Sequence, residues 1–272
     1  MHLPEFENKY KMVQRLGEGG FGCVYKVKNR STGIYYAAKV VETPVRCSYC
    51  PNTGEKLPEE ISILRSLRHE NVIRYVEHFQ GDRVWVIVME YLSGYEDLYE
   101  YMRRKDRNFD ELRAASIISQ TIKTVCYLRK RGIDHRDLKL ENILYSNRTK
   151  KIKIIDFGCA SRISTRPYTK LQGTEQYYPP EWFQNGEFSF NGGTVWAIGL
   201  MTYMLLNGKA PFPSPSQRDF SSRNCSKIKW RNSNISSLAK KFIKKCLRFK
   251  SYERIHLDDM IKAKWLKLAS FV

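Results

Sequence analysis

Two acids and an amide stand out in the stretch GIDHRDLKLENILYSNRTKKIKIIDFGCA, residues 132–160. Asp137, Asn142 and Asp156 follow one another at spacings of five and then fourteen residues, in a stretch that is rich in basic and apolar residues. Two carboxyl groups and an amide in such a setting raise the question of which chemistry needs them side by side. Two features nearer the N-terminus narrow the answer.

The first feature is a glycine-rich segment, LGEGGFGCVYKV at 16–27, with Gly17, Gly19 and Gly22 in the pattern G-x-G-x-x-G. Glycine lets backbone N–H groups approach phosphates with no Cβ in the way. Dinucleotide-binding folds share the pattern, but there it joins a strand to a helix, whereas here the strand-like CVYKVKNR follows. The segment therefore predicts a hairpin that covers a nucleotide.

The second feature is a single cation, Lys39, within the apolar strand-like run YYAAKVV. Lysine is seldom buried without a partner, so this side chain should have an acidic mate. Glu60, on a predicted helical segment, is the candidate.

The elements that must position these residues change in character near residue 92. Strand-like runs rich in Val, Ile and Tyr come first, at 9–17, 22–30, 33–42, 72–80 and 83–91. One helical segment, 57–71, interrupts them, with Pro58 at a favourable first helical position. After residue 92 helical periodicity dominates, as at 111–132 and 235–249. We therefore expect an α+β fold with a small β-rich lobe with one main helix (about 1–92) and a larger, mainly helical lobe (about 93–272).

Composition excludes several classes of protein. The 272 residues are 42% apolar, and they include no uncharged apolar run long enough to predict a membrane span. The N-terminal residues lack the apolar core of a signal peptide, and seven scattered cysteines suit a reducing compartment, so we expect the cytoplasm or the nucleus. Cys47 and Cys50 have the spacing of metal ligands but no second pair, which favours two solvated thiols over a zinc site.

The formal net charge of +19 has two interpretations. The simpler one is a well-solvated surface on amphipathic helices, and the other is a face for acidic partners, nucleic acid or anionic lipid. No motif supports a specific nucleic-acid partner, so the first interpretation is the expectation.

HRDLKLEN followed by IKIIDFG resembles the signature of protein kinases, and the resemblance extends over about 10–266. It implies a bilobal protein-kinase fold forming one domain over 1–272, with ATP and Mg²⁺ as cofactors. It also implies that Asp137 orients the attacking hydroxyl and accepts its proton, and that Asn142 and Asp156 hold Mg²⁺.

The same resemblance implies further roles. Lys39 would hold the α- and β-phosphates of ATP, and Glu60 would fix its position. Lys139 is the residue that serine/threonine kinases carry two positions after the catalytic aspartate. GTEQYYPPEW resembles the end of a kinase activation segment, and it implies a structural ion pair between Glu181 and Arg254.

A nucleotide site around the hairpin is implied as well. Val24 and Ala37 should lie above the adenine and Leu144 beneath it, with Met89 at the back of the site. Leu16 should close the edge, and Glu90 and Leu92 should lie along the hinge. The full predicted set is Leu16, Gly17, Glu18, Gly19, Gly20, Phe21, Gly22, Val24, Ala37, Lys39, Met89, Glu90, Leu92 and Leu144.

Within the kinases the chain resembles the Pim family. Three features carry this resemblance: an extra residue between the hinge and the following helix in MEYLSGYEDLYEYM, the double proline in YYPPEW, and Thr194, where most kinases place an Asp that anchors the catalytic loop. The chain departs from Pim in its hinge EYL, in CSYC, and at Leu140 and Lys170, where Pim has acids. Another kinase of the calcium/calmodulin-kinase group is the alternative.

The Pim resemblance predicts action on protein substrates with basic residues upstream of the phosphorylated residue, and we expect the protein to be a monomer. Asp97, Glu100 and Glu141 match acidic positions that receive Arg at −3 and −5. It also predicts activity without phosphorylation of the segment 159–172, although Arg136 before the catalytic aspartate demands such a phosphate in many kinases. A nucleotide-binding pseudokinase scaffold and a small-molecule kinase are the other classes, and the intact set of site residues argues against the first.

Overall fold

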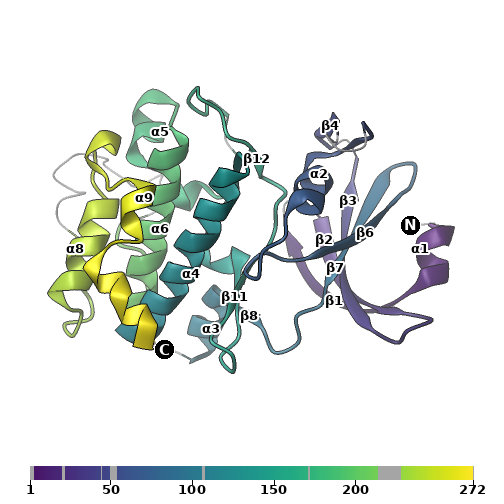
Figure 1. Ribbon diagram of the computed structural model, residues 1–272, viewed down its shortest axis with the longest axis horizontal. Coiled ribbons are helices and arrows are strands. Elements are labelled where there is room, and N and C mark those ends of the chain that lie inside the picture. Colours follow the sequence, from purple (N-terminus) through teal and green to yellow (C-terminus); the bar gives the residue numbers. More distant parts are fainter. Residues whose placement is uncertain are drawn as a thin grey trace. The chain divides into compact units, whose positions relative to one another are not determined.

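The computed structural model describes residues 3–19, 22–43, 45–49, 54–105, 108–170, 172–213 and 228–271. The chain divides into two units, Met1–Ser93 and Gly94–Val272 (Figure 1). The first is built mainly of strands and the second mainly of helices, which confirms the predicted α+β class. Within the described ranges, no helix combines the length and the apolar character that crossing a bilayer requires.

An antiparallel sheet in the order β1-β2-β3-β7-β6 forms the centre of the first unit's described residues. Its strands form where the sequence has runs of Val, Ile and Tyr, because these residues suit a pleated, half-buried surface. They are β1 (Tyr10–Gly19), β2 (Gly22–Asn29), β3 (Tyr35–Glu42), β6 (Tyr75–Gln80) and β7 (Val84–Glu90). The helices α1 (Pro4–Lys9) and α2 (Glu59–Ser66) and a small hairpin of β4 (Cys47–Tyr49) and β5 (Lys56–Pro58) accompany the sheet.

The two faces of this sheet carry different side chains, because successive residues of a strand point to opposite faces. One face packs under α1 as a buried cluster of Leu3, Phe6, Tyr10, Val27, Ala38, Val86 and Val88. The register pairs Val24 with Lys39 and Ala37 with Met89. These four side chains therefore share the opposite face, which α1 does not cover.

Helix α2 is shorter than the sequence predicts. Instead of spanning 57–71, it begins at Glu59, with Pro58 as its N-cap and not as its first helical residue, and it ends at Ser66. At that end the Arg68 guanidinium donates to two main-chain carbonyls, at 3.2 and 2.8 Å. Because the Arg68 side chain donates hydrogen bonds to carbonyls at the helix end, these carbonyls do not need the N–H groups of a further helical turn.

The second unit contains helices, short 3-10 turns and short strands. Its helices are α3 (Leu98–Lys105), α4 (Glu111–Lys130), α5 (Pro180–Asn185), α6 (Phe190–Asn207), α8 (Ser237–Cys246) and α9 (Leu257–Met260). Its 3-10 turns are η1 (Leu140–Asn142), η2 (Glu175–Tyr177), η4 (Ser251–Glu253) and η5 (Lys264–Phe271). Its strands are β8 (Glu96–Asp97), β9 (Ile133–Asp134), β10 (Ile143–Tyr145), β11 (Ile152–Ile154) and β12 (Ser161–Arg162), paired as β11-β10-β8 and β12-β9.

Helix α6 lies at the centre of this unit. Ser189 caps its N-terminus by accepting the Gly192 N–H, and every residue from Thr194 to Asn207 is buried. The helix packs against α4 and α8. A helix that is apolar all round has to be enclosed in this way.

The predicted pair of Glu181 and Arg254 is confirmed. The Arg254 guanidinium donates to both carboxylate oxygens of Glu181, at 2.7 and 2.6 Å, and its side chain is fully buried. It also donates to the main-chain carbonyls of Gly192, Arg248 and Phe249. Since these residues belong to α5, α6 and the segment before η4, one side chain fastens three parts of the unit.

Candidate functional site

The glycine-rich segment forms a hairpin between β1 and β2, in which Gly19 pairs with Gly22. The strand that follows, β2, confirms the predicted strand–turn–strand arrangement. Gly22 has a φ of +122°, and a Cβ there would lie 2.0 Å from the Val40 carbonyl oxygen of β3. Only glycine is compatible with this close approach.

The described hairpin residues Leu16, Gly17 and Glu18 are exposed. A Cβ at Gly17 would meet nothing within 4 Å, so packing within the fold does not require glycine there. Leu16 is exposed, and Glu18 pairs with an arginine three residues before it. Gly20 and Phe21, also predicted for the nucleotide site, lie outside the described residues.

Lys39 and Glu60 form the buried ion pair predicted from the sequence. The Lys39 ammonium donates to Glu60 Oε1 at 2.8 Å and to Oε2 at 2.9 Å. The two residues are 4% and 8% exposed. Because Glu60 lies in the first turn of α2 and Lys39 in the middle of β3, the pair ties the helix to the sheet and fixes the position of the ammonium group.

Three predicted adenine contacts lie on the same face of the sheet as Lys39. Ala37 and Met89 are buried and Val24 is half-buried, and the strand register places all three beside the lysine. The structure therefore brings together an apolar surface and a fixed cation, as a nucleotide base and its phosphates would require.

The three remaining predicted nucleotide contacts, Glu90, Leu92 and Leu144, are not part of the group of side chains around Lys39. Glu90 ends β7 and accepts the Arg74 backbone N–H at 2.9 Å, and Leu92 follows it as a half-buried residue. Leu144 belongs to the second unit, where it lies in β10 and pairs with Asp97 of β8.

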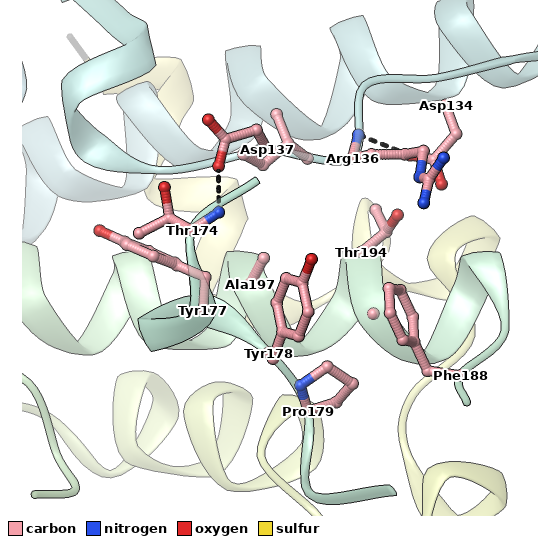
Figure 2. A pocket seen from close by; sticks show the side chains of 12 residues that line it. Asp134, Arg136, Asp137, Thr174, Tyr177, Tyr178, Pro179, Phe188, Thr194 and Ala197 are labelled. Carbon is pink, nitrogen blue, oxygen red and sulfur yellow. Dashed lines mark hydrogen bonds between the residues drawn. The ribbon is translucent and has the colours of Figure 1, made fainter. Parts of the chain in front are cut away.

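In the second unit, Asp137 is the centre of a hydrogen-bonded group that we call the catalytic-loop cluster: Asp137, Lys139, Asn142 and Thr174. The Asp137 carboxylate accepts the Asn142 side-chain N–H at 3.0 Å and lies 3.0 Å from the Lys139 ammonium. Its other oxygen accepts the Thr174 backbone N–H at 2.9 Å (Figure 2). Lys139 also donates to the Thr174 hydroxyl at 2.6 Å. The carboxylate is thus held in one orientation, with a cation beside it.

Asp156 lies next to Asn142 through the main chain. The backbone N–H of Ile155 donates to the Asn142 carbonyl at 3.0 Å, so the two predicted metal ligands stand on adjoining segments. Asp156 has a φ of +59°, which is uncommon for a residue other than glycine. Its carboxylate accepts the Gly158 N–H at 3.3 Å.

The donor set of these two residues fits a hard divalent cation. The Asn142 side-chain nitrogen is engaged by Asp137, at its main-chain oxygen and its carboxylate, which leaves the amide oxygen for a metal. An amide oxygen and the Asp156 carboxylate are ligands that Mg²⁺ accepts. Among the described residues no group of three or more His, Cys, Asp or Glu is arranged to hold a metal ion, and Mg²⁺ commonly combines one or two protein ligands with water and substrate phosphates.

Arg136 is engaged by the segment 159–172. Its guanidinium donates to the Gln172 side-chain oxygen and, at 3.3 Å, to the Lys170 carbonyl, and it lies 4.4 Å from the centroid of the Tyr168 ring. Its backbone N–H donates to the carboxylate of Asp134 at 3.1 Å. We did not identify Asp134 from the sequence.

Two more residues of the site, Gly173 and Thr174, were not predicted from the sequence. Thr174 completes the catalytic-loop cluster, and Gly173 has a φ of +94°. A Cβ at Gly173 would lie 2.8 Å from the Arg136 carbonyl oxygen and 2.9 Å from Asp137 Oδ1. The signal was the Gly-Thr pair at the start of GTEQYYPPEW, which we interpreted only as part of an activation segment.

The three acids expected to receive basic substrate side chains differ in whether the carboxylate already has a partner. Glu141 is half-buried, its Oε2 has no hydrogen-bond partner in the described structure, and burial raises its pKa. Burial also raises the pKa of Asp97, which interacts electrostatically with Glu141. Glu100, in contrast, already accepts two hydrogen bonds from Arg103, at 2.9 and 2.6 Å.

The structure describes Cys47 of the CSYC pair but not its partner in the motif, so the expectation of two solvated thiols stays a prediction. Cys47 is a free, exposed thiol whose sulfur lies 3.5 Å from the Val45 carbonyl. Cys50 lies outside the described residues.

Residues 10–266 match the protein kinase domain family. The chain is 31% identical over 276 residues to serine/threonine-protein kinase pim-2 of Danio rerio, covering 97% of this chain and 87% of that protein. It is 30% identical to serine/threonine-protein kinase prk-2 of Caenorhabditis elegans, of which it spans 59% (97% of this chain). It is 32% identical to human death-associated protein kinase 2, covering 96% of this chain and 72% of that protein.

Proposed function

The chain belongs to the protein kinase family and is a serine/threonine protein kinase, and from this premise we propose how it treats its substrates. It uses ATP with Mg²⁺ as the divalent cation, and it prefers protein substrates with basic residues upstream of the phosphorylated Ser or Thr. It is active before its activation segment, residues 159–172, is phosphorylated.

The catalytic-loop cluster is the observation that carries the proposal. Asp137 orients the substrate hydroxyl and accepts its proton as the oxygen bonds to the γ-phosphorus and the bond to ADP breaks. The hydrogen bonds from Thr174 and Asn142 keep the carboxylate in one orientation for that proton. Lys139 lies 3.0 Å from the carboxylate and is placed to meet the negative charge of the transferred group.

Two further groups of residues would handle the nucleotide. Asn142 and Asp156 would hold Mg²⁺, which when bound neutralises charge on the phosphates. Lys39, fixed by Glu60, would hold phosphate oxygens on the face of the sheet that also carries Val24. Lys39, Asn142 and Asp156 would take these roles, each at the position that its own unit of the fold defines.

The test is transfer of labelled phosphate from ATP to a peptide library. Asp137→Asn should lower kcat by about 10²–10⁴, the usual contribution of a general base. Asp259→Asn, at an exposed carboxylate that pairs with Lys262, is the matched control and should leave kcat unchanged. Full activity in Asp137→Asn would overturn the role of Asp137. Nucleotide binding without transfer by the parent would indicate a scaffold, and labelling of small molecules alone would indicate a different class of kinase.

The basic preference is supported by the state of Glu141. A buried carboxylate oxygen without a partner gains much from a cationic side chain, and arginine pairs well with carboxylates. The net charge of +19 repels basic peptides at long range, but salt screens that repulsion over about 8–10 Å. Leu140, standing where Pim has an acid, should make the selectivity milder.

A positional peptide scan tests this preference. Arg at −3 and −5 should be favoured, and Glu141→Gln should reduce the preference for Arg more than Glu100→Gln does, since Glu100 is already paired with Arg103. Indifference of the parent to Arg at −3 would contradict the proposal.

Activity without phosphorylation is supported by the contacts of Arg136. Its guanidinium is held by Gln172, the Lys170 carbonyl and the Tyr168 ring, which are groups of the activation segment itself. One observation favours the alternative of a phosphate-dependent kinase: the Arg136 Nε is buried and has no acceptor among the described residues. The test is protein made with a phosphatase, verified by intact mass, and assayed before and after autophosphorylation. A gain of a hundredfold, about 2.7 kcal/mol in barrier, would decide for the alternative.

We also propose a monomer in the cytoplasm or the nucleus. The five described cysteines are all free thiols, as expected in a reducing compartment. Light scattering coupled to size exclusion tests the oligomeric state, and imaging of a fluorescent fusion tests the location.

A further inference from the structure

Asp134 carries a buried carboxylate directly beside the catalytic loop. It ends β9, pairs with Ser161 of β12, and is 4% exposed. Its Oδ1 accepts the backbone N–H of Arg136 at 3.1 Å. Arg136 has a φ of +62°, a conformation that is unfavourable for a residue with a Cβ. The carboxylate therefore holds the strained residue that immediately precedes Asp137.

Asp134 and helix α6 contribute to the same small cavity. The cavity has a volume of about 30 Å³, and Asp134, Arg136 and Asp137 contribute to its lining (Figure 2). Thr194 and Ala197 of α6 line it as well, and Figure 2 shows the Thr194 hydroxyl directed toward the side on which Arg136 lies. None of the lining residues that α6 contributes is acidic. The carboxylates at this cavity thus come from β9, as Asp134, and from the catalytic loop, as Asp137, and not from α6.

We propose that Asp134 is a positioning residue for phosphoryl transfer: its carboxylate holds the Arg136 amide and thereby fixes the direction of the Asp137 side chain. It supplies from β9 the acid that Thr194 does not supply from α6. This inference rests on the role proposed above for Asp137.

The surroundings of Asp134 destabilise the charged form of its carboxylate. Burial raises its pKa to about 6, against the lowering effect of the Arg136 N–H and guanidinium. The other charged or titratable groups near it are His135, itself buried with a lowered pKa, and the Tyr168 hydroxyl. A perturbed buried acid beside a reacting centre is a candidate for a functional role, and a simple packing role would be met by an apolar side chain.

Kinetics of single variants separate positioning from packing. Asp134→Ala should lower kcat by about thirtyfold or more, while KM for ATP and for peptide change by less than about threefold, because the nucleotide and peptide contacts are elsewhere. Asp134→Asn keeps an oxygen that can accept the Arg136 N–H, so it should keep kcat within about fivefold of the parent. If Asp134→Ala does not fold, Asp134→Ser, whose hydroxyl is too short to replace the carboxylate, should show the same loss of kcat.

A second-site variant gives the decisive measurement. Thr194→Asp introduced into Asp134→Ala places a carboxylate at the opposite wall of the cavity and should recover kcat by about tenfold or more. Thr194→Val in the same background fills similar space without charge and should recover nothing. Recovery of thermal stability without recovery of kcat would overturn the proposal, as would an Asp134→Ala variant with kcat within threefold of the parent.

The proposed function is checked in the same assay. If Asp137→Asn is as active as the parent, the role of Asp137 fails, whatever the Asp134 variants do. If Asp137→Asn is inactive and Asp134→Ala is fully active, only the positioning role of Asp134 fails.

Discussion

Replacing Gly173 by alanine should damage catalysis through a single methyl group. The added Cβ would lie 2.8 Å from the Arg136 carbonyl oxygen and 2.9 Å from Asp137 Oδ1, closer than carbon and oxygen pack. To restore ordinary van der Waals contact, which begins at 3.4 Å, the carboxylate and the carbonyl have to move by about 0.5–0.6 Å. Since a misplacement of about 1 Å in a reacting group can cost about 10²-fold, we expect kcat to fall about tenfold or more. The φ of +94° adds a backbone cost of about 1–2 kcal/mol in stability.

Gly186→Ala is the matched control for this experiment. Gly186 also has a positive φ, +71°, as the residue that ends α5, but a Cβ there would meet nothing within 4 Å. Gly186→Ala should therefore lose about 1–2 kcal/mol of stability, which for a unit of this size lowers Tm by about 2–8 °C, and Gly173→Ala should lose at least as much. Only Gly173→Ala should lower kcat, measured with saturating ATP and peptide. An unchanged kcat in Gly173→Ala, or an equal fall in kcat in both variants, would refute the reasoning.

Lys39→Met should abolish transfer and should also lower Tm, because it removes the ammonium that neutralises the buried Glu60 carboxylate; measurable turnover would contradict the role of Lys39, and Asp156→Asn should behave alike in the transfer assay. Arg254→Ala leaves the Glu181 carboxylate without its partner and should cost about 3–5 kcal/mol, seen as a fall in Tm of roughly 6–20 °C by calorimetry; a fall under 2 °C would show that the pair contributes little. Burial raises the pKa of Asp134 from 3.8 to about 6, so the folded state favours the protonated acid and this group's contribution to stability falls by about 3 kcal/mol as pH rises from below 4 to above 6. Asp134→Asn lacks this loss, so its Tm relative to the parent should increase over that interval, and a constant difference would count against the raised pKa.

Several features could be predicted because the sequence around each one is sufficient to specify it. The glycine spacing followed by a strand-like run predicted the hairpin, and the lone cation of β3 demanded the acidic partner that Glu60 provides. The kinase resemblance supplied the Glu181–Arg254 pair and the grouping of Asp137 with Asn142.

Other features depend on contacts between distant segments. Helix α6 has no polar face, so helical periodicity of apolar residues gives no signal for it. The end of α2 was misplaced because a side chain, Arg68, and not a glycine or proline, satisfies its last carbonyls. Asp134 carries no motif of its own, and the Gly-Thr pair does not by itself show which group Thr174 contacts, so both roles appear only when β9 and the segment before η2 meet the catalytic loop.

The complete enclosure of α6 gives its backbone amides a particular use. Because every residue from Thr194 to Asn207 is buried, those amides can exchange with solvent deuterium only when the packing of α4 and α8 around the helix opens. Their exchange rate is therefore a gauge of global opening of the second unit. Amides of the catalytic loop, measured in the same sample, report local opening, so a variant that loosens only the loop is distinguished from one that destabilises the whole unit.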